Sequence, residues 1–212
     1  MKLLFFGDSL TDACRNKEHE NYNDRYGVGF VIQIVSRLLK DNPLSYEIIN
    51  RGVGGNRIID LYARIKEDVW NEKPDVITIT EGFNDVSHEI YHNNGVSLPR
   101  WEKVYRMMIE DTIKVLPKAK IIVCEPYYLH GEIPDMDFEA FGAIKEYSKT
   151  LKKIAKDYNL YYLPLQDDLL KAVKAFGDRA VTYDGIHPTV YGATLIAEKW
   201  LELFKREKLG DN

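Results

Sequence analysis

A serine residue stands in the turn that follows the first apolar run of the chain. Residues 7–12 read Gly-Asp-Ser-Leu-Thr-Asp, and Ser9 is the third of them. A serine hydroxyl can attack an ester carbonyl when a neighbouring base takes its proton. If Ser9 begins a helical turn, its own N–H points outward and can donate to the developing oxyanion. By itself, however, the segment could also be a plain turn with a capping serine.

An aspartate and a histidine three residues apart could supply the base. Asp184 and His187 belong to the sequence Asp-Gly-Ile-His-Pro, just before the last helical pattern. On a tight turn, this spacing lets the carboxylate accept a hydrogen bond from His187 Nδ1, which leaves Nε2 free to take a proton from a serine. An ordinary surface turn can have the same pattern, so the prediction depends on a position near Ser9.

Two further segments could bind an oxyanion. Residues 50–56 read Asn-Arg-Gly-Val-Gly-Gly-Asn, and residues 82–85 read Gly-Phe-Asn-Asp. Glycines let backbone N–H groups approach a ligand closely, and the side-chain amide of Asn84 is another donor. Each segment could equally be a turn, because these residue types dominate turns.

Short β-rich runs alternate with longer amphipathic segments along the chain. The predicted strands are residues 2–6, 46–50, 75–80, 120–124 and 161–165. The predicted helices are residues 30–39, 58–70, 101–115, 138–158 and 191–208. This alternation predicts an α/β fold, a three-layer αβα sandwich around a five-stranded parallel sheet with right-handed crossovers. Pro164 in the fifth run favours an edge position, which fits a flavodoxin-like strand order of 2-1-3-4-5.

This topology would bring the candidate residues to one edge of the sheet. The first strand lies between the second and third, so the loops that carry Ser9, Gly55 and Asn84 meet at the topological switch point. The loop that carries Asp184 and His187 opens at the same edge. The combination is therefore far more specific than any one of its segments.

The combined segments resemble the four conserved blocks of the SGNH (GDSL) hydrolase superfamily, spread over nearly the whole chain. The resemblance implies a single hydrolase domain over residues 1–212. It implies that Ser9 is the nucleophile and that Asp184 and His187 are its base pair. Asn84 then matches the third block and joins the N–H of Ser9 in the oxyanion hole.

The second block departs slightly from that family pattern. Most relatives have Ser-Gly-Asp or Ser-Gly-Asn, whereas this chain has Val-Gly-Gly-Asn. Gly55 matches the oxyanion glycine, and Gly54 is a rival for the same role. A G-x-S-x-G elbow is absent, so a standard α/β-hydrolase is not predicted.

A competing motif lies at residues 88–92, which read His-Glu-Ile-Tyr-His, the pattern of a zinc-binding helix. Zinc needs both histidines on a stable helix and a third ligand. Asn-Asn-Gly follows at once and breaks the helix, and Glu110 is the conceivable third ligand. A zinc metalloprotease remains an alternative function, as does a catalytically silent binding module on the same fold. In the esterase interpretation, His88 and His92 lie near the substrate.

Two long connections, residues 84–100 and 126–137, could shape a substrate site. Aromatic side chains in or beside them suit sugar rings. The predicted substrate-binding residues are Asp8, His88, His92, Trp101, Tyr127 and Tyr128.

The layout also resembles intracellular carbohydrate acetylesterases of the acetylxylan-esterase type, through a long loop after G-x-N-D and a Pro-Tyr-Tyr segment after the fourth strand. The resemblance implies short acyl esters, with acetyl foremost, on a carbohydrate. The alternative is a lysophospholipase- or thioesterase-type activity on longer acyl chains, although no long apolar lid segment is visible.

Composition narrows the classes of partner. The 212 residues carry a formal net charge of −4, with 45% hydrophobic and 29% charged residues. No broad basic face is available for nucleic acid or anionic lipid. No run reaches the roughly 18 apolar residues of a membrane helix, and the short N-terminal run predicts a cytoplasmic location. Cys14 and Cys124 are expected to be reduced. We expect no metal or organic cofactor, a small-molecule or oligosaccharide ester as substrate, and a homo-oligomer.

Overall fold

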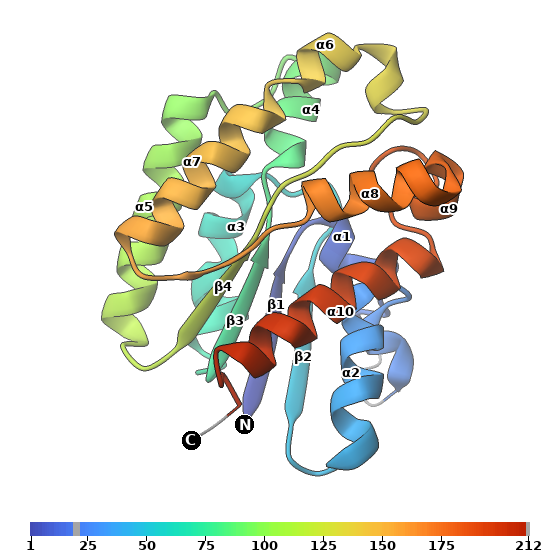
Figure 1. The fold of residues 1–212 in the computed structure, drawn as a ribbon. Helices are drawn as coiled ribbons and strands as arrows, with labels where there is room; N and C mark the ends of the chain where they lie inside the picture. The colour runs from blue at the N-terminus through green and yellow to red at the C-terminus, as the bar shows by residue number, and fades with distance from the viewer. Residues whose placement is uncertain (19–21, 211–212) are drawn as a thin grey trace.

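The computed structural model describes residues 1–18 and 22–210 and shows a sheet between two layers of helices (Figure 1). All strands are parallel and lie in the order β2-β1-β3-β4-β5. The strands are β1 (Lys2–Gly7), β2 (Glu47–Gly52), β3 (Val76–Thr80), β4 (Lys120–Cys124) and β5 (Tyr161–Leu163). The predicted fold class and strand order are confirmed.

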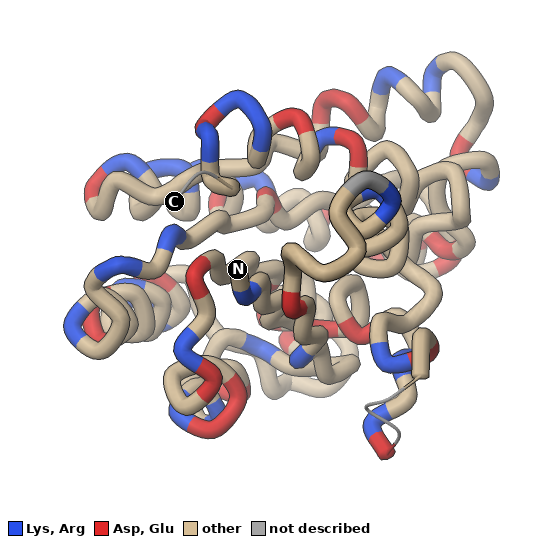
Figure 2. Tube along the Cα trace, turned by 90° about the horizontal axis from the view of Figure 1, so that it is seen from below, with Lys and Arg blue, Asp and Glu red and all other residues tan. Residues whose placement is uncertain are grey.

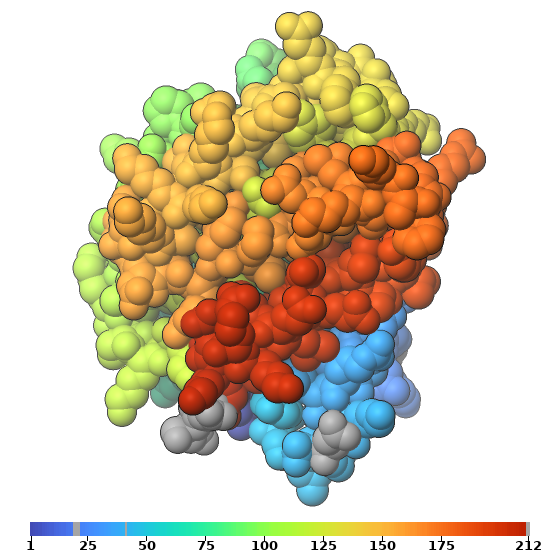
Figure 3. All heavy atoms as spheres, viewed as in Figure 1, coloured from blue at the N-terminus to red at the C-terminus, as the bar shows by residue number. Residues whose placement is uncertain are grey.

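Strand β1 shows why both faces of the sheet are covered. Its side chains alternate between the faces, and those of residues 3–6 are all apolar. Leu3 and Phe5 pack into one core with residues of α2 (Phe30–Asp41), α8 (Gln166–Phe176) and α10 (Val190–Arg206). The atoms of these three helices adjoin one another on that side of the molecule (Figure 3).

The opposite face is covered by a second set of helices. Leu4 and Phe6 pack there with residues of α3 (Ile58–Ile65), α5 (Leu98–Val115) and α7 (Ile144–Asp157). Helix α3 continues into a π-helical turn, η2 (Lys66–Trp70). The remaining elements are α1 (Ser9–Asp12), η1 (Asn23–Tyr26), α4 (Phe83–His92), η3 (Pro134–Met136), α6 (Phe138–Phe141) and α9 (Asp178–Val181).

Several details differ from the sequence-based expectations. The fifth strand ends at Leu163, so Pro164 lies just beyond it. The predicted connection at 84–100 contains α4, whose short apolar stripe of Phe83, Val86 and Ile90 is obscured by polar neighbours. The helix predicted at 138–158 is divided into α6 and α7. Helix α8 was not predicted, because only a few of its residues face the core.

The surface of the molecule carries both signs of charge along its helices, with acidic and basic residues interspersed (Figure 2). Within the described residues, no helix combines the length and the apolar character that crossing a lipid bilayer requires.

Candidate active site

Ser9 lies where β1 ends, at the start of the short helix α1. Asp8 caps that helix, since its Oδ1 accepts a hydrogen bond from the N–H of Leu10 at 3.0 Å. The strand end is tightly packed: a Cβ atom on Gly7 would lie 2.5 Å from the carbonyl oxygen of Thr80. Glycine at position 7 therefore lets α1 begin close to β3, at the carboxyl edge of the sheet (Figure 1).

A continuous set of side-chain hydrogen bonds joins Ser9, His187 and Asp184. Ser9 Oγ lies 2.9 Å from His187 Nε2, and His187 Nδ1 lies 2.6 Å from Asp184 Oδ2. The other carboxylate oxygen, Oδ1, accepts from the N–H groups of His187 and Ile186, at 2.8 and 3.0 Å. With Nδ1–H donating to Asp184, Nε2 can accept the proton of the Ser9 hydroxyl. The structure thus brings together the three side chains named as nucleophile and base pair.

The segment 126–137 supports the loop that carries Asp184 and His187. The hydroxyl of Tyr127 donates to the carbonyl of Ile186 at 2.7 Å, and the N–H of Leu129 donates to the carbonyl of Gly185 at 2.9 Å. Gly185 has a φ of 97°, and a Cβ atom there would lie 2.7 Å from Pro134 Cδ. Both the backbone conformation and the close approach require glycine at this position.

Neighbouring groups stabilise the protonated form of His187. Its hydrogen bond to Asp184 raises the pKa of His187, against the effect of partial burial, and the charges of Asp184 and Asp8 add to the rise. Partial burial acts to raise the pKa of Asp184, but the hydrogen bonds from His187 and backbone N–H groups outweigh it, so that this pKa is lowered. Burial raises the pKa of Asp8 to about 7, despite the hydrogen bond from Leu10.

The candidate oxyanion donors are three backbone N–H groups, those of Ser9, Gly54 and Gly55, and the side-chain amide of Asn84. The N–H of Gly54 donates to Asp12 Oδ2 at 3.0 Å. The N–H groups of Ser9 and Gly55, by contrast, have no hydrogen-bond acceptor among residues 1–18 and 22–210. Asn84 Nδ2 donates to the carbonyl of Asn56 at 3.0 Å and, over a longer 3.4 Å, to Asp8 Oδ2. This pattern favours Gly55 over its rival Gly54 as an oxyanion donor.

Ser9 and His187 line two hollows at the surface. The first has a volume of about 550 Å³ and the second of about 460 Å³, and the lining of both is mainly apolar. The side chains that line the first include Leu10, Ala13, Val28, Tyr183, Pro188 and Val190. Those that line the second include Asn84, Ser87, Tyr91, His92, Ile133 and Met136. An ester bound at Ser9 has two substituents, and each hollow offers room for one.

The structure corrects several predictions of substrate contact. Three aromatic side chains and one carboxylate are buried in the interior and line neither hollow: Trp101, Tyr127, Tyr128 and Asp8. Aromatic side chains in a connection bury a large apolar area when they pack inward, which is the outcome here. His92 lines the second hollow, whereas His88 lies on α4 towards Arg57 and Asp60.

Several residues of the two hollows were not anticipated from the sequence. Ser87 follows Asn84 by three residues, which places both on the same face once α4 is known to be a helix. Val190 follows the Asp-Gly-Ile-His-Pro segment by two residues. Met136 belongs to the connection 126–137, which was expected to shape the site, although the residue itself was not singled out. Val28 had no recognisable signal, because its place at the site depends on how distant loops pack.

The histidines of the zinc-like motif lie one helical turn apart. The rings of His88 and His92 have centroids 5.5 Å apart, and Glu110 on α5 instead accepts a hydrogen bond from the hydroxyl of Tyr158 at 2.5 Å. Among the residues that the structure describes, no group of three His, Cys, Asp or Glu side chains is arranged to hold a metal ion.

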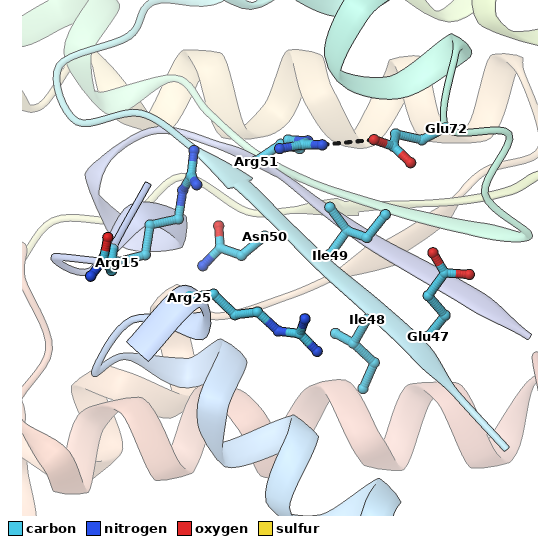
Figure 4. A pocket seen from close by; sticks show the side chains of 9 residues that line it. Arg15, Arg25, Glu47, Ile48, Ile49, Asn50, Arg51 and Glu72 are labelled. Atoms are coloured by element: carbon cyan, nitrogen blue, oxygen red, sulfur yellow. Dashed lines mark hydrogen bonds and ion pairs between the residues drawn. The ribbon is translucent and has the colours of Figure 1, made fainter. Parts of the chain in front are cut away.

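A separate hollow of about 180 Å³ lies along β2, the edge strand (Figure 4). Arg51 donates to Glu72 Oε1 at 2.7 Å, and Arg15 Nε donates to the carbonyl of Gly52 at 2.9 Å. These contacts tie the edge strand to its neighbours. The hollow is not lined by Ser9, His187 or Asp184.

Comparisons with known proteins agree with this geometry. Residues 5–195 match the model of the GDSL-like Lipase/Acylhydrolase family. An acetylxylan esterase of Geobacillus stearothermophilus is 32% identical over 206 residues, which cover 94% of this chain and 92% of the relative. The crystal structure of an acetylxylan esterase from that organism has a TM-score of 0.84 at 30% identity, over 95% of this chain and 93% of the other.

A second solved structure is similar over nearly its whole length. A GDSL-like protein from Parabacteroides merdae has a TM-score of 0.89 at 31% identity, and the match covers 96% of this chain and 95% of the other. The chain therefore belongs to the GDSL-like lipase/acylhydrolase family and is a carboxylic ester hydrolase.

Proposed function

We propose that the protein hydrolyses short-chain acyl esters, with acetyl foremost, on a carbohydrate, through an acyl-enzyme formed on Ser9. The observation that carries this proposal is the continuous set of hydrogen bonds from Ser9 Oγ through His187 to Asp184, beside the uncommitted N–H groups of Ser9 and Gly55. This arrangement has the parts that acyl transfer needs: a nucleophile, a base, an orienting carboxylate and oxyanion donors.

The proposed reaction has two steps. In the first, Ser9 Oγ bonds to the ester carbonyl carbon while His187 Nε2 takes the hydroxyl proton. The resulting oxyanion accepts hydrogen bonds from the N–H groups of Ser9 and Gly55 and from the amide of Asn84. The bond to the alcohol oxygen then breaks, and His187 gives its proton to that oxygen. In the second step, water attacks the acyl group in the same way, which releases the acid and returns the proton to Ser9.

The carbohydrate ester is supported by the relative and by the second hollow. The acetylxylan esterase of G. stearothermophilus matches over most of both chains. The hydroxyl of Ser87 and the imidazole of His92 lie in the second hollow, where they could bond to sugar hydroxyls. The alternative, hydrolysis of longer acyl chains, is favoured by one observation, the mainly apolar lining of both hollows.

Ester profiles separate these two substrate classes. With p-nitrophenyl esters of increasing chain length, we expect kcat/KM to be highest between acetate and butanoate and to fall towards octanoate. We also expect acetate to be released from acetylated xylo-oligosaccharides, measured by chromatography, with Ser9→Ala as the inactive control. A maximum of kcat/KM at octanoate or beyond, with no release of acetate from the oligosaccharides, would overturn the proposal of carbohydrate acetylesterase activity.

The activity should depend on pH through His187. Because the pKa of His187 is raised by Asp184, the midpoint of the acidic limb of kcat/KM should lie above the ordinary histidine value of about 6.5. Below that midpoint His187 is protonated and cannot take the proton of Ser9, so activity falls as pH decreases. Initial rates on p-nitrophenyl acetate from pH 5 to pH 9 measure this limb.

A matched control is available at another histidine–aspartate pair. His130 Nδ1 lies 2.8 Å from Asp135 Oδ1 on the surface, and neither residue lines the two hollows beside Ser9. The variant His130→Gln should keep the acidic limb of the wild type. A rate that stays constant from pH 5 to pH 8 would contradict the role of His187 as base.

A further inference from the structure

Two buried carboxyl groups lie near Asn84 in the chain, where β3 leads into α4. Glu81 follows β3 and is 3% exposed, and Asp85 in the first turn of α4 is 0% exposed. Glu81 Oε2 accepts a hydrogen bond from Trp101 Nε1 at 2.7 Å, and Asp85 Oδ1 accepts one from the N–H of Ile58 at 3.2 Å. Each carboxyl group therefore has one oxygen bound to a donor from another element.

The other oxygen of each carboxyl group has no hydrogen-bond donor among the described residues, although the two side chains interact with each other. Glu81 Oε1 and Asp85 Oδ2 are buried and find no donor in the described part of the chain, yet the two carboxyl groups are within hydrogen-bonding reach of one another. An ionised carboxylate has only acceptors, and two ionised carboxylates in contact repel. One proton held between the two groups supplies the missing donor for both oxygens.

The surroundings of the pair determine how firmly that proton is held. The charged or titratable groups that face the pair are Asp8, Arg57, Tyr105 and Tyr147. Burial and the charges of Asp85 and Asp8 raise the pKa of Glu81 well above its ordinary value. Burial also raises the pKa of Asp85 to about 6, although hydrogen bonds and the charge of Arg57 act to lower it. Burial thus disfavours ionisation of both carboxyl groups, which favours a proton held by the pair.

The pair is connected to the oxyanion donors through two cross-links. Asp85 Oδ1 binds the N–H of Ile58, and the adjacent Asn84 binds the carbonyl of Asn56 through Nδ2. Both bonds join the first turn of α4 to the loop that carries Gly55. Glu81 is linked to this turn through its interaction with Asp85, and its Oε2 is bound to Trp101 on α5. A change at Glu81 is thus transmitted to the amide of Asn84 and to the Gly55 loop.

We propose that Glu81 and Asp85 share one proton, and that this carboxyl pair positions Asn84 and the Gly55 loop for oxyanion binding. Glu81 is then a positioning residue for ester hydrolysis, an inference that rests on the proposed function of the site. Loss of the shared proton at alkaline pH places two negative charges side by side in the interior, with Asp8 nearby as a third. The pair separates, the cross-links to the Gly55 loop loosen, and kcat falls.

The same proton affects stability in a defined direction. In the unfolded chain both carboxyl groups have ordinary pKa values near 4, and folding raises them. The contribution of the pair to the free energy of unfolding is therefore fully present below about pH 4 and is lost as pH rises through the folded values. Removing the titration should make stability at alkaline pH less dependent on pH.

Two substitutions at Glu81 separate positioning from simple packing. Glutamine offers an oxygen to Trp101 and an N–H₂ donor to Asp85, so Glu81→Gln reproduces both bonds without a titrating proton. Leucine offers neither. We expect Glu81→Leu to lower kcat for p-nitrophenyl acetate by about tenfold to a hundredfold at neutral pH with little change in KM, as for other small displacements of catalytic groups. Glu81→Gln should keep most of the wild-type kcat at neutral pH. Its kcat should not decline at alkaline pH as that of the wild type does.

Infrared spectroscopy detects the shared proton without an activity assay. At about pH 9 Asp8, with its pKa of about 7, is ionised. Once Asp8 is ionised, the wild type should keep the carbonyl stretching band of a protonated carboxyl group until the pH at which kcat declines, and Glu81→Gln should lack this band. If circular dichroism shows that Glu81→Leu is unfolded, the pH profile of Glu81→Gln and the infrared band test the shared proton without it.

Glu125 provides a matched control at the equivalent place after β4. Its carboxylate already accepts from the hydroxyl of Ser148 and from the N–H groups of Leu165 and Gln166. The variant Glu125→Gln should keep both the alkaline decline and the infrared band of the wild type. An unchanged alkaline decline in Glu81→Gln, or a wild-type spectrum without the band, would overturn the inference. An active Ser9→Ala variant would instead overturn the proposed function and leave the infrared result valid.

Discussion

Replacing Ser9 with alanine is expected to lower kcat for p-nitrophenyl acetate by about ten-thousand-fold or more, as the removal of a catalytic serine does elsewhere. Ser9 Oγ is the group that lies against His187 Nε2, at 2.9 Å, and alanine leaves the imidazole without a nucleophile to deprotonate. The side chain is half-buried and small, so its removal creates no large cavity. The thermal midpoint should therefore stay close to that of the wild type while turnover is lost.

A second serine on the surface provides the control for this experiment. Ser36 on α2 is exposed and donates only to the carbonyl of Gln33, so Ser36→Ala should keep full activity. A chelator should leave the wild type unaffected. Full activity in Ser9→Ala, combined with inhibition by the chelator, would contradict the serine mechanism. It would favour the alternative of a zinc site at His88 and His92.

The strands and their order could be predicted from the sequence because burial on both faces leaves a strong pattern. The runs at Val76–Thr80 and Lys120–Cys124 are almost entirely apolar or β-branched, as central parallel strands are. The short helix α4 was harder to recognise. Its first turn carries Asn84, Asp85 and Ser87, polar residues that face the site or a buried carboxyl group instead of water. Functional residues therefore masked the amphipathic pattern of the element that holds them.

The catalytic residues of the candidate site could be predicted from the sequence, but the residues that line its hollows could not. Ser9, Asp184 and His187 belong to short segments whose spacing has a chemical meaning, and the sheet order places these segments together. The choice between Gly54 and Gly55 depends on which N–H points towards Asp12, which is a property of the backbone turn. Likewise, no local pattern distinguishes an aromatic residue that lines a hollow from one such as Trp101, which packs inside and donates to Glu81.

Asparagine at position 184 cannot reproduce the hydrogen bonds of the native carboxylate. Oδ2 accepts from His187 Nδ1, and Oδ1 accepts from two backbone N–H groups, those of Ile186 and His187. If the amide N–H₂ replaces Oδ1, it meets two donors. If it replaces Oδ2, it donates to Nδ1, and the proton of the imidazole moves to Nε2. In that tautomer Nε2 cannot accept the proton of Ser9.

We therefore expect Asp184→Asn to lower kcat by about a thousandfold to ten-thousandfold with a smaller effect on KM, as at comparable triads. Because the hydrogen bond to Asp184 raises the pKa of His187, the acidic limb of the residual activity should shift to lower pH. The variant Asp135→Asn makes the same chemical change beside His130, at an exposed pair 2.8 Å apart, and should leave kcat unchanged. Equal kcat values for the two variants would show that Asp184 does no more than cap its own turn, and that another group orients His187.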